Sequence, residues 1–345
     1  MKRSPSPGRC GGPGRAAATR ARCRAWGWPA ALALCLGTQL VPAWAQRAGD
    51  TGSPAAPLGA GTHTLVVNHG GLKRKALVHI PPGYDATKPA PLVLAFHGGG
   101  GHAEFMADDE RYGLGRKADR EGFVVVFPNG YSKFPGGRFA TWNAGACCGD
   151  ARDRNIDDVG FVRAVVGAVQ AQVRIDSTRV FATGMSNGGM LSYRLACEAA
   201  DLFRAVASVA GTDATLACAP ARPVSVLHIH AKDDTHVLFK GGAGKDAFRD
   251  ASKVMDFVSV PETVSRWVKR NQCAAAPIRV LDKPGATCES TAGCAGGATV
   301  QLCVTDDGGH SWPGAQTVRR GKEGASRALD ANDVIWDFFK ASAAR

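Results

Sequence analysis

A serine in a glycine-rich turn is the residue of this sequence best suited to covalent chemistry. Residues 184–188 are Gly-Met-Ser-Asn-Gly, and they stand between an apolar run, RVFAT, and a helical run, MLSYRLACEAA. In a strand–turn–helix setting this G-x-S-x-G spacing forms a nucleophile elbow, which lifts the serine hydroxyl clear of the backbone. The amides at the start of the following helix favour negative charge beside it. We therefore predict that Ser186 is a nucleophile.

A serine hydroxyl is too weakly acidic to attack an ester unaided, so it needs a base and an acid that orients the base. In elbow-type hydrolases these partners follow the serine in the order Asp or Glu, then His. His310 lies in the glycine-flanked loop DGGHSWPG, directly after the apolar run ATVQLCV. Such a loop lets the imidazole reach the serine, and we predict that His310 is the base.

The orienting acid is expected between Ser186 and His310 in the chain. Asp233 and Asp234 both follow the apolar run VSVLHI, and their spacing alone does not distinguish between them. The acidic residues at 306–307 are too close to His310 in sequence to be favoured.

A second glycine-rich stretch supplies candidate donors for a developing negative charge. His97 and four glycines follow the apolar run PLVLAF, which is the position of an HGGG-type oxyanion loop. We predict that the backbone amides of Gly98, Gly99 and Asn187 form the oxyanion hole. A phosphate-binding loop would continue with Lys and Ser or Thr, and this stretch does not. The predicted chemistry needs no metal and no cofactor.

The elements that must position these residues are short apolar runs that alternate with helical patterns. The expected strands are 75–80, 92–96, 123–127, 179–183, 205–209, 224–230 and 299–304. The expected helices are 112–120, 158–173, 188–199, 261–271 and 326–341. This alternation predicts an α/β fold with a mainly parallel central sheet and helices on both faces. In such sheets the chemistry lies at the carboxyl ends of the strands, where the three motifs stand.

The first 45 residues form a separate segment. They hold seven basic residues and no acidic one, and an apolar run of about 14 residues leads to Ala43-Trp44-Ala45. This is the pattern of a secretory signal peptide, and the run is shorter than the roughly 20 residues that span a bilayer. We predict cleavage near Ala45 and a mature protein that is extracellular or periplasmic and not in the membrane.

The remaining chain is expected to hold a flexible lead-in at 46–62, rich in Gly, Ala and Pro, and one catalytic domain at 63–345. Because the last predicted helix runs almost to Arg345, no appended substrate-binding module is expected. At 45% hydrophobic and 21% charged, the 345 residues exclude a disordered chain, a coiled coil and a multi-pass membrane protein. Without the leader the net charge falls from +12 to about +5, too diffuse to predict a nucleic-acid partner.

Eight of the eleven cysteines lie beyond the leader, and an even number in an exported chain predicts disulfides. We expect Cys288 to close a short loop with Cys294, and Cys273 to pair with Cys303. The other four, at 147, 148, 197 and 218, are then expected to pair among themselves. A stapled loop is favoured there over a vicinal redox pair of residues 147 and 148.

The three motifs and their order resemble the secreted esterases of the polyhydroxybutyrate depolymerase type, α/β-hydrolases with feruloyl and acetyl-xylan esterase-like members. The resemblance extends from LVLAFHGGGG through FVVVFPNG, TWNAGACCG and HIHAKDD to GGHSWPG. It implies an α/β-hydrolase fold and a Ser-His-Asp acyl-enzyme mechanism. The implied substrates are oligomeric or polymeric hydroxyalkanoate, aryl or acetyl esters. The family's H-G-x-x-D pattern selects Asp234 as the acid, although Ala231 replaces the usual glycine and Asp233 stays open.

Two other functions fit parts of the sequence. His228, His230, Asp234 and His236 are types and spacings that a metal-dependent hydrolase uses, although a one-residue offset breaks the H-x-H-x-D-H pattern. A non-catalytic binding protein on a hydrolase scaffold is the other alternative, because fold does not imply activity.

Three further features need a place in the structure. Trp142 and Trp312 are candidate substrate contacts, the second because it follows His310 by two residues. Residues 157–158, both Asp, precede a helical run and are predicted to cap its N-terminus.

Overall fold

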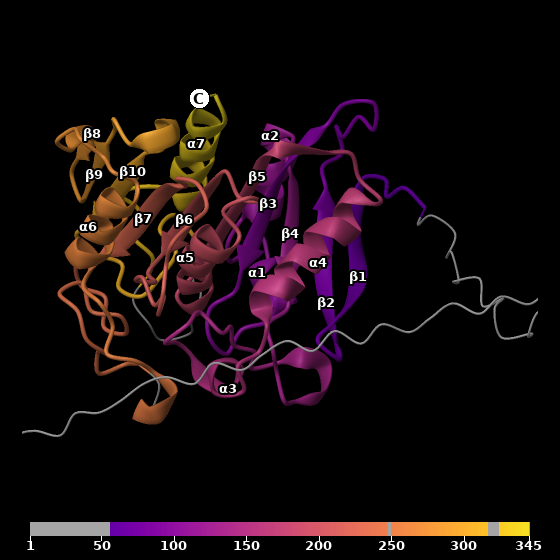
Figure 1. Ribbon diagram of the computed structural model, residues 1–345, viewed down its shortest axis with the longest axis horizontal. Coiled ribbons are helices and arrows are strands. Elements are labelled where there is room, and N and C mark those ends of the chain that lie inside the picture. The colour runs from indigo at the N-terminus through magenta and orange to yellow at the C-terminus, as the bar shows by residue number, and fades with distance from the viewer. Residues whose placement is uncertain (1–55, 248–249, 317–323, 345) are drawn as a thin grey trace, which may run out of the picture. The chain divides into compact units, whose positions relative to one another are not determined.

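A ten-stranded sheet runs through the part of the chain that the computed structural model describes, residues 56–247, 250–316 and 324–344. Its strand order is β1-β2-β4-β3-β5-β6-β7-β10-β9-β8 (Figure 1). The strands are β1 Gly61–His69, β2 Leu72–Ile80, β3 Ala90–Phe96, β4 Val124–Pro128, β5 Ile175–Met185, β6 Ala205–Val209, β7 Ser225–Ala231, β8 Ile278–Lys283, β9 Ala286–Thr291 and β10 Val300–Thr305. The six central strands of this order, β4-β3-β5-β6-β7-β10, are parallel. Strand β2 pairs antiparallel with β4 on one side, and β9 pairs antiparallel with β10 on the other.

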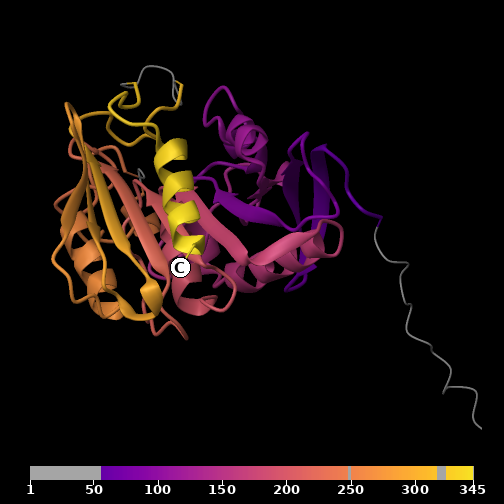
Figure 2. The same ribbon diagram turned by 90° about the horizontal axis from the view of Figure 1, so that it is seen from above.

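Helices cover both faces of this sheet. They are α1 Ala103–Met106, α2 Leu114–Glu121, α3 Gly149–Asp153, α4 Asp158–Gln170, α5 Asn187–Glu198, α6 Val260–Arg270 and α7 Ala331–Ala343. Three short 3₁₀ turns span Pro135–Gly137, Ala251–Lys253 and Ala295–Gly297. Figure 2 shows α7 on the opposite side of the sheet from α4 and α5.

Strand β3 shows why the sheet must be covered on both faces. Leu92, Leu94 and Phe96 belong to the apolar cluster that includes α4, α5 and α6. The intervening Val93 and Ala95 belong to the other cluster, with α2 and α7. Successive side chains of a strand point to opposite faces, so a strand that is apolar at every position must be buried on both. The predicted fold class is confirmed.

The expected elements are present within a few residues of their predicted ends. The strands that the sequence analysis missed are β1, β8 and β9, which lie in the antiparallel flanks. All six residues of β8 are at least partly exposed, so no apolar run marks it. Strand β1 begins at Gly61, inside the segment expected to be a flexible lead-in. The predicted signal peptide and the first ten residues of the lead-in lie outside the described residues.

The disulfides correct two predicted pairings. Among the described residues, four bonds join Cys147 with Cys148, Cys197 with Cys218, Cys273 with Cys294, and Cys288 with Cys303. Cys288 and Cys303 stand directly opposite each other in the antiparallel pair of β9 and β10, so the strand register decides their partner. Cys294 lies beyond β9 and instead meets Cys273, just after α6. The vicinal pair at 147–148, the less favoured alternative, is the one observed.

Of the two predicted helix-capping aspartates, only Asp157 caps α4, by accepting the amide of Gly160 at 2.8 Å. Asp158 is fully buried and forms an ion pair with Arg74 of β2. Its other oxygen accepts the amide of Asn143 at 2.7 Å. Asp158 therefore ties the loop before α3 to the sheet.

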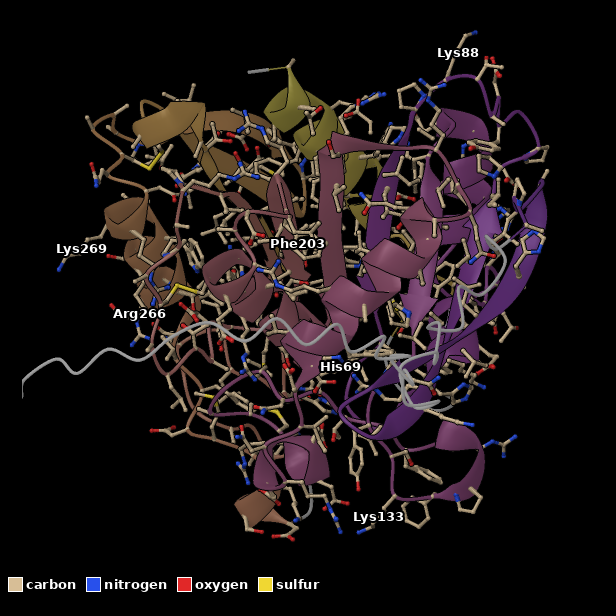
Figure 3. All side chains as sticks on the ribbon, turned by 45° about the vertical axis from the view of Figure 1, so that its right-hand side comes forward. His69, Lys88, Lys133, Phe203, Arg266 and Lys269 are labelled. Carbon is tan, nitrogen blue, oxygen red and sulfur yellow. A yellow bond between two sulfur atoms is a disulfide. The ribbon has the colours of Figure 1, made fainter. Side chains whose placement is uncertain are left out.

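Several basic side chains lie on the surface of the described chain. Figure 3 shows Lys88 and Lys133 at separate places on the periphery and Arg266 and Lys269 together on α6, while Phe203 is fully buried. Among the described helices, none is both long enough and apolar enough to cross a membrane.

Candidate active site

Ser186 stands on a strained turn between β5 and α5. Its backbone has φ 54° and ψ −120°, a region that non-glycine residues rarely occupy. The turn is held because the Ser186 amide donates to Val209 O at 2.8 Å and the Ser186 carbonyl accepts the amide of Met190 at 2.9 Å. This is the conformation expected of a nucleophile elbow.

The glycines on either side of Ser186 are required by close packing. A Cβ on Gly188 would lie 2.3 Å from Phe96 O and 2.6 Å from His97 O, and one on Gly184 would lie 2.5 Å from the Gly188 carbonyl carbon. Real Cβ atoms do not approach other atoms this closely. The turn can therefore pack against the end of β3 only if residues 184 and 188 are both glycine.

His310 and Asp234 are in direct contact, although 76 residues separate them. His310 Nδ1 lies 2.8 Å from Asp234 Oδ2, and both side chains are at least nine-tenths buried. Asp234 Oδ1 accepts the backbone amides of His236 at 2.7 Å and Val237 at 3.0 Å. Burial opposes ionisation of Asp234, but the attraction of His310 and the hydrogen bonds from His230 and His310 outweigh it and hold its pKa well below the usual range.

The neighbouring Asp233 has a different contact. It is exposed, and its Oδ1 accepts the backbone amide of Gly309 at 2.8 Å. Asp233 therefore anchors the loop that carries His310, while Asp234 touches the imidazole itself.

The glycine stretch after β3 is held from both sides. His97 is fully buried, and its Nε2 accepts the amide of Gly130 at 3.0 Å, so its Nδ1 carries the proton and donates to Gly98 O at 2.8 Å. Burial lowers the pKa of His97 to about 4, which keeps this arrangement neutral. The amide of Gly100 donates to Ala140 O at 2.8 Å. These bonds fix the stretch beside Ser186, where a Cβ built on Gly98 would lie 3.4 Å from Ser186 Cβ.

Trp142 is not where the sequence analysis expected it. Its side chain is fully buried and is absent from the residues that line the cavity beside Ser186. Its indole Nε1 donates to His97 O at 2.9 Å, and its backbone amide and carbonyl bond the side chain of Asn187 at 2.7 and 3.0 Å. Trp142 therefore braces the glycine stretch after β3 and the start of α5.

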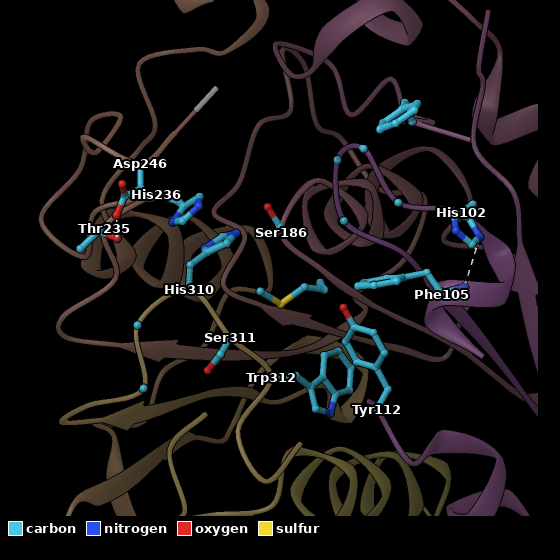
Figure 4. A pocket seen from close by; sticks show the side chains of 18 of the residues that line it. His102, Phe105, Tyr112, Ser186, Thr235, His236, Asp246, His310, Ser311 and Trp312 are labelled. Carbon is cyan, nitrogen blue, oxygen red and sulfur yellow. Dashed lines mark hydrogen bonds between the residues drawn. The ribbon is translucent and has the colours of Figure 1, made fainter. Parts of the chain in front are cut away.

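A cavity of about 680 Å³ opens beside Ser186. Figure 4 shows Ser186 and His310 facing the same hollow, with Tyr112 and Trp312 side by side on another wall. The predicted residues that line it are Gly98, Gly99, Ser186, His310 and Trp312. The lining residues that the sequence analysis did not single out for contact with a substrate include Phe105, Tyr112, Arg138, Phe139, His236 and Lys245.

Two of these residues carry information that no sequence motif held. The ring of His236 stacks on that of His310, with centroids 4.4 Å apart and planes 15° apart. Phe139 is 68% exposed and lies at a positive φ of 54° on the cavity wall. Its exposure on an irregular loop follows no periodicity, so sequence patterns could not have found it.

The histidines of the proposed metal cluster do not converge on one point. His228 and His230 bond each other, and their remaining ring nitrogens bond Tyr193 Oη and Val237 O. Asp234, His236 and His310 do bring one ligand atom each to within 4.8 Å of one another. The nitrogen lone pairs lie in the plane of each imidazole, and nearly parallel stacked rings do not aim them at a common ion. This trio fits a hydrogen-bonded site better than a metal site.

The fold and the strained serine beside an Asp–His pair define the class of the α/β-hydrolases. The chain belongs to the esterase PHB depolymerase family, whose model matches residues 75–254. It is accordingly a carboxylic ester hydrolase.

Several curated relatives are esterases. Feruloyl esterase B of Piromyces equi is 31% identical over 243 residues, which cover 69% of this chain but only 42% of that protein. The putative esterase NocK of Nocardia uniformis subsp. tsuyamanensis is 32% identical, and the match covers 78% of this chain and 79% of the relative. A probable feruloyl esterase C of Aspergillus niger is 28% identical, with 78% and 84% covered. The solved structure of native sOPH shares the fold at a TM-score of 0.50 and 17% identity, over 74% of this chain and 83% of that one.

Proposed function

We propose that this protein cleaves carboxylic esters through an acyl-enzyme formed on Ser186, with His310 as base and Asp234 as orienting acid. The observation that carries the proposal is the contact of His310 Nδ1 with the buried Asp234 Oδ2 at the wall of the cavity that Ser186 also lines. A carboxylate on Nδ1 leaves Nε2 as the nitrogen that takes the serine proton.

The reaction proceeds in two acyl transfers. Ser186 Oγ attacks the ester carbonyl carbon while its proton passes to His310 Nε2, and the C–O bond to the alcohol breaks as His310 returns that proton to the leaving oxygen. Water then attacks the acyl-enzyme, His310 takes the proton of the water, and the carboxylic acid leaves as the proton returns to Ser186. Asp234 holds the imidazole in one tautomer and stabilises its charged form throughout.

The negative charge on the tetrahedral oxygen needs donors that are already in place. We assign this role to the backbone amides of Gly98 and Gly99 and of Asn187. Gly100 and Gly101 already donate to Ala140 O and Gly98 O, which leaves the two earlier amides of the stretch for the substrate. The side chain of Asn187, clamped by Trp142, supports the position of its own amide.

A covalent inhibitor tests the mechanism against the metal-dependent alternative. An alkyl phosphonate fluoride is expected to abolish esterase activity and to add one phosphonyl group to the peptide that contains Ser186, as measured by mass spectrometry. Incubation with EDTA is expected to leave activity unchanged. Loss of activity with EDTA and its return with Zn²⁺, without labelling of Ser186, would contradict the serine mechanism.

The lining of the cavity supports a substrate whose acyl group is aryl or a short hydroxyalkanoate. Phe105, Tyr112 and Phe139 line it, and aromatic rings offer a large apolar contact area at fixed geometry. The feruloyl esterases among the relatives favour the aryl side of this proposal.

Phe139→Ala is expected to raise KM for methyl ferulate about three- to tenfold while changing kcat little, because an exposed ring provides binding contact without touching the reacting atoms. The smaller p-nitrophenyl acetate should be affected less. Leu216→Ala is a matched control, since Leu216 is also an exposed apolar residue but lies outside this cavity. Equal KM changes in the two variants would show that Phe139 does not contact the acyl group.

We also propose that the mature protein acts outside the cytoplasm after cleavage near Ala45. The leader pattern supports this, and so do the four disulfides, which persist in oxidising compartments. The mass of the exported chain tests it.

A further inference from the structure

We propose that His230 is a positioning residue that holds the catalytic acid, and that Tyr193 and His228 fix His230 in turn. The proposal rests on the assignment of Asp234 as the acid of the esterase mechanism. It gives a role to the histidines at 228 and 230, which the nucleophile, base and oxyanion groups leave unexplained.

Two hydrogen bonds and one ion-pair contact join the side chains of Tyr193, His228, His230 and Asp234 into a continuous buried chain from α5 to the acid. Tyr193 Oη lies 2.6 Å from His228 Nδ1, and His228 Nε2 lies 3.0 Å from His230 Nδ1. His230 Nε2 lies 3.1 Å from Asp234 Oδ2 and 2.8 Å from Val237 O. The four side chains of the chain are at most 3% exposed.

The acceptors at one end fix the first proton, and the order of the others follows for an uncharged His230. His230 Nε2 faces a carboxylate and a carbonyl, which only accept, so this nitrogen must carry a proton. The Nδ1 of a neutral His230 then accepts, and His228 Nε2 must donate to it. The remaining nitrogen of His228 accepts from the Tyr193 hydroxyl. Each donor therefore points along the chain toward Asp234.

Burial supports this neutral arrangement. It lowers the pKa of His228 well below its usual value, so the ring stays uncharged, and it raises the pKa of Tyr193, so the phenol keeps its proton. The planes of the two imidazoles differ by 11° and their centroids are 5.2 Å apart, so the rings meet edge to edge. This is the orientation that an in-plane hydrogen bond between His228 Nε2 and His230 Nδ1 needs.

This chain completes the set of donors around the acid. Asp234 Oδ1 accepts two backbone amides, and Oδ2 accepts His310 and lies 3.1 Å from His230 Nε2. Without His230, Oδ2 is located by His310 alone, the group that it has to orient. The same chain connects Asp234 to Tyr193 on α5, the helix that begins directly after Ser186. It therefore ties the position of the acid to that of the nucleophile.

His230→Leu removes the donor and keeps an apolar side chain of similar size. We expect kcat for p-nitrophenyl butyrate to fall about 10- to 100-fold with KM within threefold, because a hydrogen bond to a charged group is lost where the imidazolium forms. His230→Gln should recover most of kcat, since its amide offers one donor and one acceptor at nearly the spacing of the two ring nitrogens.

Asn271→Leu is the control for loss of stability. Asn271 is equally buried and bonds Val224 O just before β7 at 2.8 Å, but it has no link to Asp234. At a similar drop in melting temperature, Asn271→Leu should keep kcat within about threefold. A folded His230→Leu that also keeps wild-type kcat would overturn the proposal.

A second measurement needs no variant. Nitrogen NMR of the histidine-labelled wild-type protein should show His228 and His230 as neutral rings protonated at Nε2, and an Nδ1-protonated His230 would refute the arrangement. Because this NMR measurement uses the wild-type protein, it tests the arrangement even if His230→Leu does not fold. Phosphonate labelling of Ser186 in the wild-type protein separates the two hypotheses, since its absence contradicts the esterase mechanism and its presence leaves the role of His230 to the tests above.

Discussion

Replacing Ser186 with alanine should lower kcat for ester hydrolysis by about 10⁴-fold or more, with little change in KM. Under the proposed mechanism, the variant lacks the oxygen that forms the acyl-enzyme, while the cavity and the amides assigned to the oxyanion hole remain. The residual rate then comes from binding and oxyanion stabilisation of attack by water. Steady-state kinetics with p-nitrophenyl butyrate, at enzyme concentrations high enough to detect this residue, measure the effect.

The substitution should leave the fold intact. The elbow is held by the backbone bonds of Ser186 to Val209 and Met190, which alanine keeps. Ser192→Ala is a matched control, because Ser192 is a buried serine of α5, the helix that follows Ser186. Its hydroxyl donates to Gly188 O at 3.1 Å. It should lose less than about tenfold in kcat. Unchanged turnover by Ser186→Ala would refute the assignment of the nucleophile.

Asp234→Asn is expected to reduce kcat by about 10⁴-fold, the order seen when a triad acid is replaced by its amide. The new carbonyl can still accept the amides of His236 and Val237, so the loop is retained. The new NH₂ group, however, faces the N–H groups of His310 and His230, and donors then meet donors. His310 is released or adopts the tautomer that cannot take the serine proton.

Asp233→Asn provides the matched comparison. An asparagine carbonyl can still accept the amide of Gly309, so kcat/KM should stay within about tenfold of the wild type. Measuring kcat/KM for both variants distinguishes the two carboxylates. A severe loss in Asp233→Asn with a mild one in Asp234→Asn would reverse the assignment.

The lowered pKa of Asp234 also predicts how the free energy of unfolding of Asp234→Asn depends on pH. An unfolded Asp has a pKa of about 3.9, and the folded value lies below it, so ionised Asp234 stabilises the fold above about pH 3.9. That contribution is lost as the pH falls through the folded pKa. Asp234→Asn should therefore lower the free energy of unfolding at pH 7, and the difference from wild type should shrink at acid pH.

The sequence was most informative for buried strands, because burial requires a run of apolar residues. Strand β3 is apolar at all of its positions because both of its faces are covered, and its prediction was accurate to two residues. Strand β8 carries no such pattern because it lies at the edge of the sheet, largely exposed. Expectations for the edges therefore failed while those for the centre were confirmed.

Partners far apart in the sequence were the other source of error. Cys288 has one candidate six residues away and another fifteen away, and only the register of β9 against β10 selects Cys303. Trp142 is a residue type that often contacts ligands, but in the folded chain its indole donates to His97 O. Neither outcome leaves a trace in spacing.

The sequence by itself determined the fold class and marked Ser186 and His310, because a sharp turn dictates its own glycines and the order of motifs follows the order of strands. The tertiary structure decided which carboxylate meets His310, which cysteines pair, and that Tyr193, His228 and His230 stand in line behind Asp234. Those features depend on distances between segments that the chain brings together only when the sheet forms. A side chain's partner is a property of that packing, whereas a turn's geometry is a property of a few adjacent residues.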